Sequence, residues 1–105
     1  MELESILKEL TQTYGFLDVS YTAGGEAPGL EVCLVLTPAQ INKMIAKANS
    51  LNRCIASCAD ILSMFGDGVS KEELLKTTVR CAGNNQLYIR THESMVKMLV
   101  EMLFD

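Results

Sequence analysis

The sequence has no tryptophan, two prolines, one histidine and few aromatic residues, and its basic residues are outnumbered by acidic ones. Nine lysines and arginines stand against 13 aspartates and glutamates, which gives a net charge of −4. Because neutralised phosphates supply most of the affinity for nucleic acids, this balance argues against a nucleic-acid partner. No apolar run approaches the roughly 20 residues that cross a bilayer. The acidic first residues also lack the basic and then apolar order of a signal peptide. We therefore expect a cytoplasmic protein with no membrane partner.

Hydrophobic residues make up 49% of the 105-residue chain, which is enough for a packed core and too many for a disordered protein. A chain of this length buries roughly two-thirds of the surface that it exposes when unfolded, so it needs neither a disulfide nor a metal to fold. Its length is typical of one domain. We predict a single α+β domain over residues 1–105.

Hydrophobic periodicity and turn residues predict eight elements. Their order, α-β-β-α-α-β-β-α, gives a small antiparallel sheet made of two hairpins, a long central helix and flanking N- and C-terminal helices. The predicted elements are helix 2–14, strands 16–22 and 30–36, helix 38–65, a short helix at 72–75, strands 77–82 and 86–90, and a last helix that begins at Thr91.

Threonine is predicted to begin two of these helices. Thr37 precedes Pro38, which is the N-cap and first-position pattern of a helix start. Thr91 is predicted to cap the last helix in the same way. The strand at 30–36 is nearly all apolar, so we expect it to be covered on both faces of the sheet.

The helix predicted at 38–65 is the most informative segment. Its apolar residues recur at alternating steps of three and four, the spacing of a helical interface. At 1.5 Å per residue it would be about 40 Å long, enough to cross a domain of this size. The predicted interface residues are Ile41, Met44, Ala48, Leu51, Ile55, Cys58, Leu62 and Phe65.

Two interpretations of this helix stay open. In the first, the stripe packs on the protein's own sheet and the other side faces water. In the second, the helix also contacts a partner, most simply its own copy across a two-fold axis. The helix has only four charged residues, Lys43, Lys47, Arg53 and Asp60, whereas helices that face water usually carry more. We predict a homodimer or heterodimer through residues 38–65, with another protein as a further partner.

No catalytic group of residues is found in the sequence. His92 follows Thr91 near a predicted helix start, where a neutral surface imidazole is expected. The carboxylates fall at termini and on helix surfaces without an acid–base pair. We therefore predict a protein that is not an enzyme and needs no cofactor. Its function would be that of an adaptor, chaperone or inhibitor.

Two alternatives involve a small ligand or a metal. A nucleotide or metabolite could bind a pocket lined by Tyr21 or Tyr88 and by methionines, which adapt to varied ligands. Those methionines are Met44, Met64, Met95, Met98 and Met102. The less favoured alternative is a thiolate metal or redox site. Cys54 and Cys58 are four residues apart, but Cys33 and Cys81 do not form a second pair with zinc spacing.

Overall fold

The computed structural model of the protein describes residues 2–26, 28–65 and 68–105. It confirms the predicted α+β class and element order. The elements are α1 (Leu3–Tyr14), β1 (Asp18–Ala23), β2 (Leu30–Val35), α2 (Pro38–Leu62), α3 (Lys71–Leu75), β3 (Thr78–Ala82), β4 (Gln86–Thr91), a 3-10 turn η1 (Glu93–Met95) and α4 (Val96–Phe104). Within the described residues, no helix has the length and apolarity that a membrane span requires.

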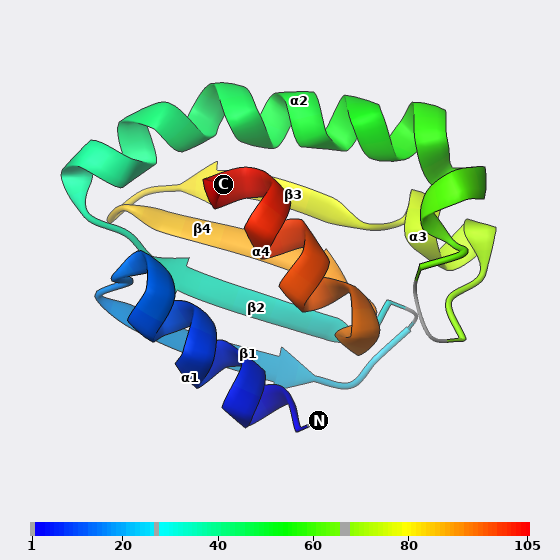
Figure 1. Ribbon diagram of the computed structural model, residues 1–105, viewed down its shortest axis with the longest axis horizontal. Coiled ribbons are helices and arrows are strands. Elements are labelled where there is room, and N and C mark those ends of the chain that lie inside the picture. Colours follow the sequence, from blue (N-terminus) through cyan, green and yellow to red (C-terminus); the bar gives the residue numbers. More distant parts are fainter. Residues whose placement is uncertain (1, 27, 66–67) are drawn as a thin grey trace.

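The two hairpins join into one antiparallel sheet with the strand order β1-β2-β4-β3 (Figure 1). The second strands of the two hairpins, β2 and β4, lie side by side, with Val32 opposite Ile89. The first strands, β1 and β3, therefore form the two edges of the sheet. Local sequence patterns predict each hairpin, but they do not specify how one hairpin pairs with the other.

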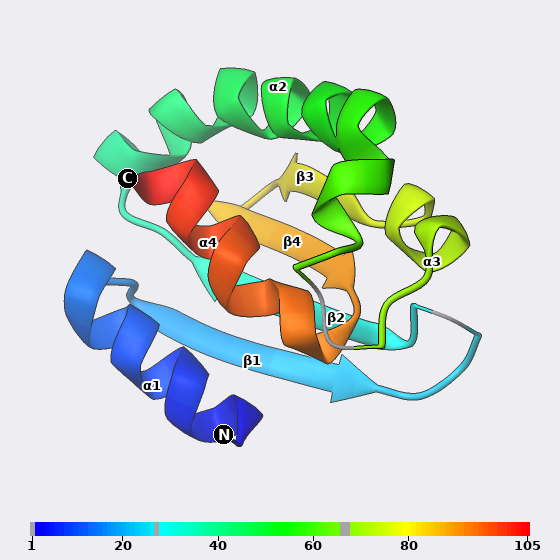
Figure 2. The same ribbon diagram turned by 45° about the vertical axis from the view of Figure 1, so that its right-hand side comes forward.

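Helices α1 and α4 pack against one face of the sheet, and α2 runs along the edge strand β3 (Figures 1 and 2). The core lies between these helices and the sheet, where Leu34, Leu87 and Ile89 are fully buried. In β2, fully buried residues alternate with the half-buried Glu31, Cys33 and Val35. The expectation that this strand is covered on both faces is therefore wrong, because only one face is packed under helices.

Capping residues explain where the helices begin and end. Thr37 Oγ1 accepts a hydrogen bond from the Gln40 amide, and Gln40 Oε1 accepts one from the Thr37 amide, so the predicted start of α2 is confirmed. Gly15 ends α1 with a left-handed φ of 73°. The prediction for Thr91 is wrong. It is the last residue of β4, fully buried with its hydroxyl 3.2 Å from that of Thr77, and His92 caps η1 instead.

Candidate interaction surfaces

Most of the stripe predicted as an interface on α2 is buried in the protein's own core. The five residues from Ile41 to Ile55 in that stripe are each at most 8% exposed, and they pack with the sheet and α4. In the single chain these side chains contact the core rather than solvent. The buried members are Ile41, Met44, Ala48, Leu51 and Ile55. Their contact with a partner stays a prediction, and the accessible part of the stripe is its C-terminal end.

The C-terminal end of α2 departs from the predicted straight helix. The helix is kinked at Cys58, which has φ −118° and ψ 18°, and it ends at Leu62 rather than at Phe65. Cys58 and Leu62 are half-buried, and Phe65 lies in the following turn with 69% of its surface exposed. Ile61 and Met64 are also exposed, by 59% and 81%. We call Ile61, Met64 and Phe65 the 61–65 cluster.

Two members of this cluster were not predicted as interface residues. Neither Ile61 nor Met64 falls on the stripe of three-and-four steps from Ile41 to Phe65, so that periodicity does not assign them to the interface. The steps of three and four from Ile61 to Met64 and Phe65 are the signal that could have grouped them. Large apolar side chains gathered in one exposed turn are typical of contact sites.

One side chain of α2 binds the outer edge of the sheet at a single residue of β3. Asn52 Oδ1 accepts a hydrogen bond of 2.9 Å from the Val79 amide, and Asn52 Nδ2 donates one of 2.7 Å to the Val79 carbonyl. The Val79 backbone points outward, away from β4, so the side-chain amide takes the place of a neighbouring strand. The sequence gives no signal for this contact, because Asn52 is one of several polar residues on the helix.

The opposite edge of the sheet, at β1, is open. Gly24 donates to the Gly29 carbonyl, and the same register makes alternate residues of β1 bond to β2. The backbone groups of Val19, Tyr21 and Ala23 therefore point away from the sheet. Among the residues that the structure describes, nothing hydrogen-bonds to these outward groups.

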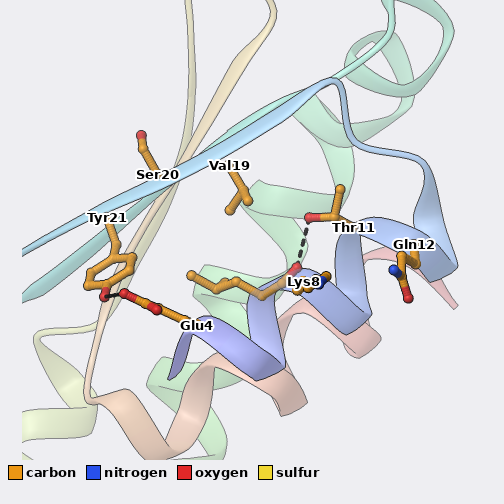
Figure 3. Close-up of a pocket in the computed structure, with 8 residues that line it drawn as sticks. Glu4, Lys8, Thr11, Gln12, Val19, Ser20 and Tyr21 are labelled. Carbon is orange, nitrogen blue, oxygen red and sulfur yellow. Dashed lines mark hydrogen bonds between the residues drawn. The ribbon is translucent and has the colours of Figure 1, made fainter. Parts of the chain in front are cut away.

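A groove of about 500 Å³ lies between this open edge and α1 (Figure 3). Val19 points from β1 toward the helix, whereas Ser20 points away from it. We call this feature the α1–β1 groove. Its lining residues are Glu4, Leu7, Lys8, Thr11, Gln12, Val19, Ser20 and Tyr21.

One end of the α1–β1 groove is acidic. The Tyr21 hydroxyl donates a 3.1 Å hydrogen bond to Glu4 Oε1. This hydrogen bond, and after it burial and the negative charges of Glu4, Glu93 and Glu2, raise the pKa of the Tyr21 phenol above its usual 10.0. Glu2, Glu4 and Glu93 also line a second hollow on the other side of Tyr21. Glu93 is far from Glu2 and Glu4 in the sequence, and the fold brings it to the start of α1.

The four cysteines are distributed over three places. Cys33 lies on the less covered face of β2, Cys81 lies on β3, and Cys54 and Cys58 are one turn apart in α2. Burial raises the pKa of the Cys81 thiol, and burial together with the nearby Cys58 raises that of Cys54. In the described part of the chain, no three His, Cys, Asp or Glu residues are placed to hold a metal ion.

The methionines do not surround one cavity. Met95 is fully buried and Met98 is partly buried against the core. Met44 lines a hollow with Tyr14 and Phe104, and Met102 lines another with Leu51 and Cys54. Met64 belongs to the 61–65 cluster. Binding of a nucleotide or metabolite stays a prediction, and the α1–β1 groove beside Tyr21 has no methionine in its lining.

Comparison with known proteins gives no relative. No protein-family model matches the chain, and no curated protein or solved structure matches it. Any proposal for its function is therefore argued from the surfaces described above.

Proposed function

We propose that this protein is a non-enzymatic interaction module, an adaptor, chaperone or inhibitor, that associates with a second copy of itself through the outer side of α2. The observation that supports the proposal most is the 61–65 cluster, in which Ile61, Met64 and Phe65 are each more than half exposed within one turn. Soluble monomers seldom leave neighbouring large apolar side chains in water unless another surface covers them.

The rest of α2 is compatible with a helix-to-helix contact. Its 25 residues, with a kink at Cys58, run along the β3 side of a molecule whose longest dimension is 34 Å. Three of its four charged residues already have a polar partner in the chain. Lys47 Nζ donates to the Leu103 carbonyl, Arg53 Nη2 donates to Ser50 Oγ at 3.5 Å, and Asp60 pairs with Lys71 at 3.0 Å. The outer side consequently has few free charges to desolvate when a second copy packs on it.

The experiment is a measurement of molar mass by light scattering at micromolar protein concentration. We expect the wild-type protein to have the mass of a dimer. Met64→Glu and Phe65→Glu should each have the mass of a monomer, because a carboxylate in an apolar contact loses its hydration without gaining a partner. Both variants should still unfold cooperatively on heating, since both side chains are exposed in the single chain and the substitutions leave its core unchanged.

The matched control is Leu17→Glu, which introduces the same charge at an exposed leucine just before β1. Its amide donates to the Val35 carbonyl near the start of α2, so it lies away from the 61–65 cluster at the other end of that helix. This variant should keep the dimer mass. A wild-type protein that is monomeric across the concentration range, or Glu variants that keep the dimer mass, would contradict the proposal.

A further inference from the structure

The open edge of β1 is the second surface that the fold leaves without a partner, and it lies at the end of the sheet opposite to α2 (Figures 1 and 2). We propose that this edge binds an extended peptide segment of another protein. The segment adds a fifth strand to the sheet, places an apolar side chain in the α1–β1 groove, and places a lysine or arginine at its acidic end. This inference does not depend on the proposed self-association through α2.

The backbone of β1 specifies the kind of occupant. Val19, Tyr21 and Ala23 each direct one amide and one carbonyl away from β2. Successive outward residues of a strand are about 6.6 Å apart, because each residue advances the chain by about 3.3 Å. Another extended backbone repeats its donors and acceptors at the same distance. A peptide strand therefore matches the whole row, which is how extended peptides bind exposed sheet edges.

The α1–β1 groove explains how such a peptide would be selected. Its floor includes the buried Leu7 and the half-buried Val19, so it is apolar beside the polar backbone edge. The Thr11 hydroxyl is already used by a 2.7 Å bond to the Leu7 carbonyl. Because alternate side chains of a strand point to the same side, one or two apolar residues of the incoming segment would enter the groove.

Charge complementarity specifies the rest of the segment. The carboxylates of Glu2, Glu4 and Glu93 lie around Tyr21 at one end of the groove, and Lys8 is the one basic residue in the groove lining. The protein as a whole carries a net charge of −4. A basic side chain at this end would gain favourable charge interactions, which weaken as salt is added.

The test begins with a displayed library of random peptides, each longer than the six residues of β1, panned against the purified full chain. Recovered peptides should combine alternating apolar residues with a lysine or arginine near one end. A labelled synthetic copy of one recovered peptide is the probe, and its affinity is measured by fluorescence anisotropy. A library that yields no binder overturns the proposal.

Two N-methylated forms of the probe then test the backbone contact. In a paired strand, alternate amides face β1 and the others face water. Methyl groups on the amides that face β1 should weaken binding by about tenfold or more, because hydrogen bonds are lost and the strands are forced apart. Methyl groups on the remaining amides should leave the affinity within about threefold. Equal effects of the two forms would show that side chains alone bind the probe, and this overturns the proposal.

Charge variants and the oligomeric mass locate the contact. Glu4→Lys should weaken binding of the basic probe by about tenfold, whereas Glu9→Lys, which changes an exposed residue of α1 outside the groove, should not. An equal loss of probe affinity in both variants would show that the basic side chain of the probe does not bind at Glu4, and this overturns the proposal. Excess probe should leave the mass of the wild-type protein unchanged and should bind Phe65→Glu as well as wild type. A probe that dissociates a wild-type dimer would instead identify a second copy as the occupant of β1.

Discussion

The two edges of the sheet differ in one side chain. At β3 the outward amide and carbonyl of Val79 are both bound by Asn52 of α2. At β1 the equivalent groups of Val19 and Tyr21 have no partner among the described residues, although a helix lies beside that strand too. An unpaired edge can pair with any other extended chain, so proteins usually cover or interrupt it. The comparison shows that a helix side chain binds the β3 edge at Val79, whereas no described residue binds the outward groups of β1.

The position of each helix accounts for the difference. Helix α2 runs along β3 close enough for one amide side chain to reach the strand. Helix α1 packs below β1 on the covered face of the sheet, and between the two there is a groove of about 500 Å³ (Figure 3). The following substitutions compare the two edges directly.

The largest expected difference is between proline at Val79 and proline at Ala23. Val79→Pro removes the amide that donates to Asn52 and replaces a side chain that is only 2% exposed, so we expect a loss of about 3 kcal/mol or more in the free energy of unfolding. Ala23→Pro removes an outward amide that has no partner in the chain, and it should cost within about 1 kcal/mol. Urea unfolding measures the free energy of unfolding of both variants. Equal losses would show that the outward amides of β1 and β3 do not differ in their bonding.

The second substitution removes the side chain that binds the β3 edge at Val79. Asn52→Ala eliminates two hydrogen bonds to Val79 and should destabilise the protein by about 2 kcal/mol. The matched control Asn49→Ala changes an exposed asparagine one turn earlier in α2, and it should be neutral or stabilising by up to about 0.7 kcal/mol, since alanine favours helix. Hydrogen exchange gives a second readout, because the Val79 amide should exchange faster in Asn52→Ala and not in Asn49→Ala. Unchanged protection of that amide would contradict the role of Asn52.

Local patterns in the sequence predict the elements well because each depends on neighbouring residues. Thr37 with Pro38 marks the start of α2, and Gly15 marks the end of α1, through contacts within a few residues. The order of the strands is different. It depends on how β2 and β4 pair across more than 50 residues, and either strand of each hairpin could have been at the edge. Helix patterns also do not show the kink at Cys58 or the end of α2 at Leu62, which leaves Met64 and Phe65 in an exposed turn.

The candidate sites are less predictable than the fold for a related reason. The spacing of the apolar stripe of α2 predicts a partner interface, but periodicity does not distinguish a partner from the protein's own sheet. Most of the stripe, from Ile41 to Ile55, is covered by the sheet and α4. The α1–β1 groove combines two elements whose sequences show no functional motif. It arises because β1 is an edge strand, and this follows from the strand order.

The smallest effect is expected from the acidic end of the open edge. The Tyr21 phenol donates to Glu4, and ionising it would place two negative charges together, so its pKa is raised above 10.0. Glu4→Gln should lower the pKa of Tyr21, seen as an earlier rise in tyrosinate absorbance during an alkaline titration. Glu9→Gln, which lies on α1 without contacting Tyr21, should leave the titration unchanged.

The dependence of stability on pH has a defined sign at this contact. A phenol whose pKa is raised by folding contributes stability that is fully present below pH 10, and this contribution is lost as the pH rises through the raised value. The difference in stability between wild type and Glu4→Gln should therefore be constant from neutral pH to about pH 10 and shrink above it. A difference that grows with pH in this range would mean that Glu4 contributes through something other than its bond with Tyr21. The effect should be small, because both side chains are exposed to solvent. For the same reason both groups stay accessible to a basic side chain of an incoming strand, whereas the amide of Asn52 is already committed to β3.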